Sequence, residues 1–184
     1  MDFNVLHKMK ALSIAFLLAL PIYGDDEAWP LSTDKVIYSA TVNQTQFKVF
    51  FSTGAFDRTN HKIIPLRVEG DTGYLPRVDG HTVVGLDGDV PPTEARFPHL
   101  TRLAVSFGGK VVEAPAKLIS HVFMPHGDTT FGLEGQSGRV AISSDGKTVT
   151  IELGVGDGAA AGWTAFTFSI NGTCRLGLPE PPTP

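Results

Sequence analysis

Glycines follow a β-branched run in residues 148–163, TVTIELGVGDGAAAGW, and the spacing of Gly154 and Gly156 has the outline of a dinucleotide-binding turn. A site of that kind requires a helix directly after the glycines, because the helix N-terminus binds the pyrophosphate. Phe166, Phe168 and Ile170 instead alternate with small residues, which predicts a strand. We therefore expect a bend between two strands and no nucleotide site.

Histidines are the candidate ligands for a transition metal such as zinc. His121, His126 and Asp128 lie in HVFMPHGD, and the two histidines are five residues apart, whereas two ligands on one helix face need the i, i+4 spacing. A helix end carrying His121 and a loop carrying His126 could still converge with His81 or His99.

Aspartates beside glycine are the candidate ligands for calcium. Asp87 and Asp89 lie in GLDGDV, and Asp128 also follows a glycine. Carboxylates and exposed carbonyl groups in such loops suit a hard cation, although aspartate next to glycine is also ordinary turn chemistry. We expect no cofactor, with calcium as the alternative.

Two aromatic residues are candidates for ligand binding. Trp163 has the opposite parity to Phe166 and Phe168, so we expect its indole to lie off the core face, where it could stack on a sugar ring. Tyr74 lies in a predicted loop. The alternative for Trp163 is that it seals the edge of the core.

No catalytic constellation is assembled in the sequence. Ser137 lies in GQSGR, which lacks the glycine spacing of a nucleophile elbow. Cys174 is the only cysteine, so an intramolecular disulfide is excluded, and no helix terminus adjoins it in sequence to lower its pKa. We therefore expect a protein that is not an enzyme.

The N-terminus predicts a signal peptide over residues 1–24. Lys8 and Lys10 precede an apolar stretch that ends at Gly24 and is followed by acidic residues. That stretch is shorter than the roughly 20 residues that span a bilayer, so we expect no transmembrane segment in the mature chain. Met9 is an alternative start. We expect export to the periplasm or the cell exterior.

The chain has 184 residues and a formal net charge of −4. Lysines and arginines form no cluster, which argues against nucleic acid and anionic lipid as partners. Residues 25–178 are expected to form one domain, and the proline-rich residues 179–184 a disordered tail.

Turn residues between alternating segments predict consecutive hairpins. A type I′ turn at Asp145-Gly146 would set Val140 against Ile151 and Ile142 against Val149. Similar turns are predicted at 108–109 and at 43–44, the latter with Val36, Tyr38, Phe47, Val49 and Phe51 on the core face.

The last hairpin needs a three-residue loop, residues 170–172, because that loop sets Phe168 against Cys174. A two-residue turn would set Phe168 against Arg175. The longer loop keeps the core face apolar and predicts a buried, unreactive thiol.

One helix is predicted over residues 115–123, with Leu118, Ile119, Val122 and Phe123 on one stripe and Pro125 as its stop. Residues 69–99 are expected to form long loops with at most one short strand. The predicted fold is all-β: a single antiparallel domain of hairpins, a β-sandwich or a partly open barrel, with one short helix.

Two segments resemble exported bacterial proteins of unknown function. They are residues 78–125, which begin VDGHTVVGLDGDV, and residues 145–168, DGKTVTIELGVGDGAAAGWTAFTF. The resemblance implies a setting in the bacterial envelope and transfers no activity and no role to any residue.

These observations predict an exported, non-enzymatic β-domain that binds a protein or a glycan in the cell envelope or outside the cell, because binding residues are often carried on loops of a rigid scaffold. The alternative is a metal-dependent site in the loops rich in Asp, Gly and His, acting as a hydrolase or as a calcium-assisted binder. A third hypothesis is a structural envelope component that pairs through an exposed edge strand.

Overall fold

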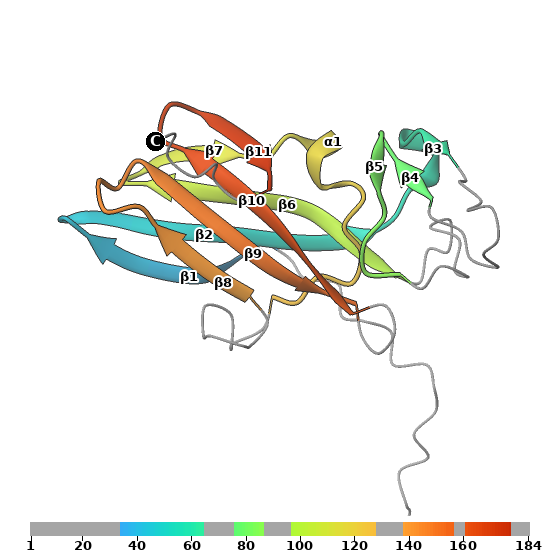
Figure 1. Ribbon diagram of the computed structural model, residues 1–184, viewed down its shortest axis with the longest axis horizontal. Helices are drawn as coiled ribbons and strands as arrows, with labels where there is room; N and C mark the ends of the chain where they lie inside the picture. The colour runs from blue at the N-terminus through green and yellow to red at the C-terminus, as the bar shows by residue number, and fades with distance from the viewer. Residues whose placement is uncertain (1–33, 65–75, 87–96, 128–137, 157–160, 178–184) are drawn as a thin grey trace, which may run out of the picture.

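The computed structural model describes residues 34–64, 76–86, 97–127, 138–156 and 161–177 (Figure 1). The chain is mostly β-structure, arranged in two four-stranded sheets and one three-stranded sheet, all antiparallel. The expected all-β class with one short helix is confirmed. No helix within the described ranges is long and apolar enough to cross a membrane.

The first sheet has the strand order β1-β2-β6-β7. Its strands are β1 (Lys35–Val42), β2 (Thr45–Ala55), β6 (Pro98–Phe107) and β7 (Lys110–Glu113). The second sheet has the order β11-β10-β9-β8, in which each strand pairs with its neighbour in sequence. Its strands are β8 (Gly138–Ile142), β9 (Thr148–Val155), β10 (Gly162–Ser169) and β11 (Thr173–Leu176).

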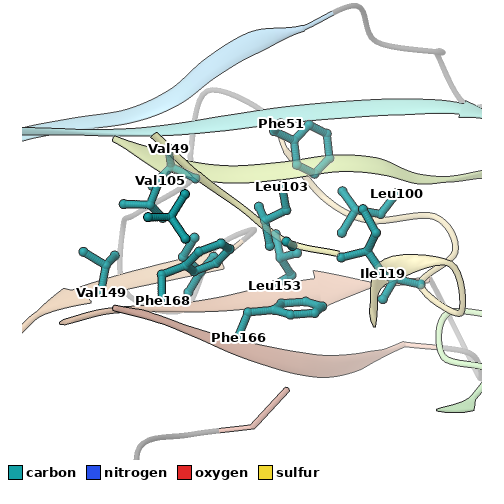
Figure 2. Close-up of a cluster of buried hydrophobic side chains, with 14 of the residues drawn as sticks. Val49, Phe51, Leu100, Leu103, Val105, Ile119, Val149, Leu153, Phe166 and Phe168 are labelled. Carbon is teal, nitrogen blue, oxygen red and sulfur yellow. The ribbon is translucent and has the colours of Figure 1, made fainter. Parts of the chain in front are cut away.

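One apolar core lies between these two sheets. Phe51, Leu103 and Val105 face it from the first sheet, and Leu153 and Phe168 from the second (Figure 2). The alternation of side chains along each strand places these residues on one face. The two sheets are hydrogen-bonded separately in the described part of the chain, so the architecture is a β-sandwich.

Four hairpin turns gather at one end of the sandwich, namely those of β1–β2, β6–β7, β8–β9 and β10–β11 (Figure 1). There Asn43 Nδ2 donates a hydrogen bond to Ser144 O at 2.9 Å, and Lys110 Nζ donates to Ile170 O at 2.6 Å. These bonds connect turns that belong to different sheets, and thereby fix the spacing of the two layers at this end.

A small sheet lies at the opposite end. It has the order β3-β4-β5 and follows a 3-10 helix, η1, and the single-turn helix α1 lies near it (Figure 1). The elements are η1 (Arg58–Asn60), β3 (Ile63–Ile64), β4 (Arg77–Val78), β5 (His81–Thr82) and α1 (Ala116–Ile119). A second apolar cluster, which includes Phe56, Val78 and Phe123, anchors this sheet.

Several predicted registers are confirmed. Val105 pairs with Val112 across a turn in which Gly108 and Gly109 have φ of 57° and 100°. Phe168 pairs with Cys174, as the three-residue loop requires. The strand expected after the glycines is also present, because β10 begins at Gly162 and pairs antiparallel with β9.

The hairpin of β8 and β9 has the predicted register, with Val140 opposite Ile151 and Ile142 opposite Val149, but not the predicted turn type. Gly146 has φ of 67°, whereas Asp145 does not have positive φ. The Asp145 side chain instead accepts a hydrogen bond from Lys147 N at 3.0 Å. A left-handed conformation at Asp145 is therefore not needed to close the loop.

Val36 was expected on the core face and is not there. A bulge between Val36 and Tyr38 shifts the register, so Val36 lies opposite Phe50 and is 48% exposed. The extra residue of a bulge reverses the alternation of side chains on one side of it.

The predicted helix is much shorter than expected, since α1 is a single turn. Val122 and Phe123 leave the helix and form isolated bridges with Val84 and His99. Backbone groups of these two residues are hydrogen-bonded to neighbouring segments: Val122 O accepts from Leu100 N, and Phe123 N donates to Val84 O. Met124 has φ of 45°, which is not helical, so regular structure ends there. Pro125 is not needed as the stop.

A hairpin lies in the segment that was expected to form mostly loops. Val78 pairs with His81, so Asp79 and Gly80 form a two-residue turn between β4 and β5, with φ of 53° and 93°. Positive φ at both central residues is the type I′ geometry.

Candidate functional site

Asp79 joins three segments at the end of the sandwich that carries the small sheet. Its carboxylate accepts hydrogen bonds from His61 Nδ1 at 2.8 Å, from Lys62 N at 3.0 Å and from Ser120 Oγ at 2.7 Å. The carboxylate therefore ties β3 and the end of α1 to the β4–β5 turn. Burial raises the pKa of Asp79, but these hydrogen bonds outweigh it and lower the pKa to about 2.

His81 and His121 lie next to each other beside this turn. Their ring centroids are 5.0 Å apart and the rings are inclined by 31°. His121 is only 2% exposed, and its Nδ1 has no hydrogen-bond partner. Burial, and to a smaller extent His81, lowers the pKa of His121 to about 4, so the ring is neutral at pH 7.

An unpartnered buried ring nitrogen is unusual, because such an atom loses its hydrogen bonds to water on folding. The cost is about 1 to 3 kcal/mol for a neutral polar group. Buried side-chain polar atoms in native proteins are therefore almost always satisfied by protein, water or an ion. His121 Nδ1 is thus the atom of this region that most needs an external partner.

The other described histidines have partners. The His61 ring stacks on Phe56 with centroids 4.9 Å apart, and His99 Nδ1 donates to Gly54 O at 3.1 Å. Burial lowers the pKa of His99. His126 Nε2 donates to Gly156 O at 2.7 Å and so holds the loop after α1 onto the end of β9.

The metal ligands predicted from sequence are not brought together among the described residues. No group of three or more His, Cys, Asp or Glu side chains is arranged there to hold an ion. His121 lies beside His81, whereas His126 is hydrogen-bonded to Gly156 O. Asp87, Asp89 and Asp128 lie outside the described residues, as do Ser137 and Tyr74.

Trp163 is placed on the outer face of the second sheet, on the side opposite to Phe166 and Phe168, as its parity predicts. The indole is 52% exposed. Trp163 lies directly opposite Gly154 in the β9–β10 register, and Ala165 is the next residue of β10 on the same face. Because neither neighbour has a large side chain, the indole is not covered by them.

The next row of the same face carries a pair of opposite charges. Ala165 lies opposite Glu152, and Glu152 lies opposite Arg139 on β8. Arg139 Nη2 donates to Glu152 Oε2 at 2.9 Å. Diagonal neighbours on a sheet are about 7 to 8 Å apart, so Glu152 lies at about that distance from Trp163, and Arg139 lies one strand further away.

Nucleophilic chemistry is not supported by the geometry of the described residues. Ser120 is buried and donates its hydroxyl hydrogen to Asp79, not to a histidine that could act as a base. Cys174 is half-buried, and burial raises the pKa of its thiol to about 12, which keeps it protonated. The thiol was expected to be buried and is only half-buried, whereas the raised pKa agrees with the expected low reactivity.

Sequence reasoning missed the network around Asp79. The signal available was the Asp79-Gly80 dipeptide, which is typical of a two-residue hairpin turn. Its partners Ser120 and His61 carry no local signal, because they come from segments distant in sequence.

The comparisons with known proteins add no relative: no family model, no curated protein and no solved structure matches the chain.

Proposed function

We propose that this protein is an exported, non-enzymatic binding domain, and that its ligand is a glycan held on the outer face of the second sheet. The observation that carries the proposal is Trp163, a half-exposed residue on the outer face of the second sheet, beside residues without large side chains. An aromatic ring in that position offers an apolar surface on which the apolar face of a pyranose can stack.

The surroundings of Trp163 favour a glycan over a protein. A protein interface needs a contiguous apolar centre with several large side chains. Here a single aromatic residue lies beside Gly154 and Ala165, and the next row holds the Arg139–Glu152 ion pair. Charged side chains at that distance can exchange hydrogen bonds with sugar hydroxyl groups.

The edges of the sandwich argue against the hypothesis of a structural component that pairs through strands. β7, β8 and β11 are short, and β1 carries a bulge near its start. Short edges and bulges are features that prevent edge-to-edge pairing between copies. Export itself is proposed from the basic and apolar N-terminal residues.

The proposal is tested by titrating residues 25–184 with bacterial and plant envelope glycans, using calorimetry and Trp fluorescence in a Trp29→Phe background. Trp163→Ala should weaken binding by about 2 kcal/mol, or roughly 30-fold in Kd, as for a central aromatic contact. Val111→Ala is the matched control, since Val111 is exposed on the first sheet.

Equal weakening in both variants would refute a site at Trp163. Binding of a protein from the same envelope, lost in Trp163→Ala while every glycan fails, would replace the glycan by a protein partner. Secretion is checked separately by N-terminal sequencing of the exported chain, and an intact N-terminus in the cytosol would contradict export.

A further inference from the structure

The side chains of His81 and His121 form a pair that the proposed glycan site does not use. The two ring centroids are 5.0 Å apart, with the ring planes inclined by 31°, at the end of the molecule that carries the small sheet. His121 is buried, whereas His81 is half-buried and so connects the pair to solvent.

We propose that His81 and His121 bind a divalent transition-metal ion of the borderline class, of which copper(II) is the tightest binder, through one imidazole nitrogen each. Imidazole suits copper, zinc and nickel, and among divalent ions affinity is highest for copper. Two protein ligands leave the remaining positions to water, since no group of three or more ligand side chains is arranged among the described residues.

The first argument is the unpartnered Nδ1 of His121. In the described part of the chain it is the only buried side-chain nitrogen or oxygen without a hydrogen bond. A metal ion bound beside it would supply the missing partner. His61, His99 and His126 each use a ring nitrogen in a hydrogen bond, so they do not share this property.

The second argument is that the backbone on both sides of the pair is fixed. Ser120, which precedes His121, donates a hydrogen bond to the carboxylate of Asp79. Asp79 lies in the two-residue turn that leads into His81. Val84 N donates to His121 O at 3.1 Å. Two ligands lose little conformational freedom on metal binding when hydrogen bonds already hold the residues that support them.

The test uses the full chain without an affinity tag. Copper(II) is titrated at pH 7 against a competing chelator, and the electron paramagnetic resonance spectrum of the bound ion is recorded. We expect one site per chain with nitrogen couplings from two imidazoles. His81→Gln should weaken binding by about tenfold or more. His126→Gln, which removes another half-buried imidazole that is hydrogen-bonded to Gly156 O and not to Asp79, should not.

Equal affinity in His81→Gln and the unchanged chain would overturn the site, as would a spectrum without couplings from two imidazoles. His121→Asn is a second variant; because it can disturb the core, its folding is checked by circular dichroism, and the conclusion rests on His81→Gln if it fails to fold. Zinc is measured by competition with copper, and should be displaced from the same site.

Discussion

Asp79 Oδ2 lies 2.7 Å from Ser120 Oγ, so a carboxylate in a two-residue turn is bonded to the residue that follows α1. The same oxygen accepts from His61 Nδ1. One side chain therefore connects the small sheet to the segment that carries His121, and its loss should loosen both.

Asp79→Asn should lower the free energy of unfolding by about 1 to 3 kcal/mol, the usual cost of weakening a group of hydrogen bonds to a charged acceptor. Asparagine tolerates the positive φ of this position, so the effect reports the lost charge and not backbone strain. Urea unfolding measures it. Asp145→Asn, in an exposed turn, is the control and should change stability by less than about 0.5 kcal/mol.

Gly85→Ala should destabilise the fold more than Gly80→Ala. A Cβ at Gly85 would lie 2.1 Å from Phe123 O, and the residue also has φ of 85°. At Gly80, where φ is 93°, nothing lies within 4 Å of the added atom. We expect a loss of about 1 kcal/mol at Gly80, from backbone conformation alone, and at least about 3 kcal/mol at Gly85. Similar midpoints of thermal unfolding would show that the backbone moves to accommodate the clash.

The thiol of Cys174 should react slowly in the folded protein at pH 8 and rapidly in urea. Burial raises its pKa from an ordinary value of 9.0 to about 12, so the reactive thiolate is scarce. Above pH 9 the unfolded chain loses the thiol proton before the folded chain does. This group therefore lowers the free energy of unfolding progressively between pH 9 and 12. Chromogenic thiol titration checks the rate. Fast labelling of the folded chain would mean that the thiol is open to solvent.

Phe168→Ala should cost about 3 to 5 kcal/mol, because it opens a cavity at the centre of the sandwich core. Val111→Ala, on the exposed face of β7, should cost less than about 0.5 kcal/mol. Denaturant unfolding of the two variants gives the comparison. A small loss at Phe168 would indicate that the two sheets collapse onto the gap.

Turn chemistry predicted the hairpins better than it predicted turn types. The pairing of Phe168 with Cys174 followed from keeping one face apolar, and this criterion depends only on local sequence. Asp145-Gly146 was expected to be a type I′ turn and is not, whereas Asp79-Gly80 has that geometry and was not predicted. An Asp-Gly dipeptide indicates a turn, but the strands on either side decide its conformation.

The features that are hardest to predict are long-range. From the sequence, His81 and His99 were alternative neighbours of His121, and only the structure shows that His81 is next to it, because neither position carries a local sign of its partner. The displacement of Val36 by a bulge also has no local signature. Trp163 was predictable, since alternation along one strand is enough to place it on the outer face.

The strand order has a consequence for the kinetics of folding. Every strand pair of the sandwich joins strands that are neighbours in sequence, except the pair of β2 and β6. β2 ends at Ala55 and β6 begins only at Pro98, so a long segment separates them. Closing that loop is the step with the largest entropic cost, whereas the β8–β11 meander requires only short loops. The C-terminal half of the chain should therefore gain amide protection first in pulsed hydrogen exchange. Pairing of β2 with β6 should be the slow step that limits the rate at which the domain becomes resistant to proteases.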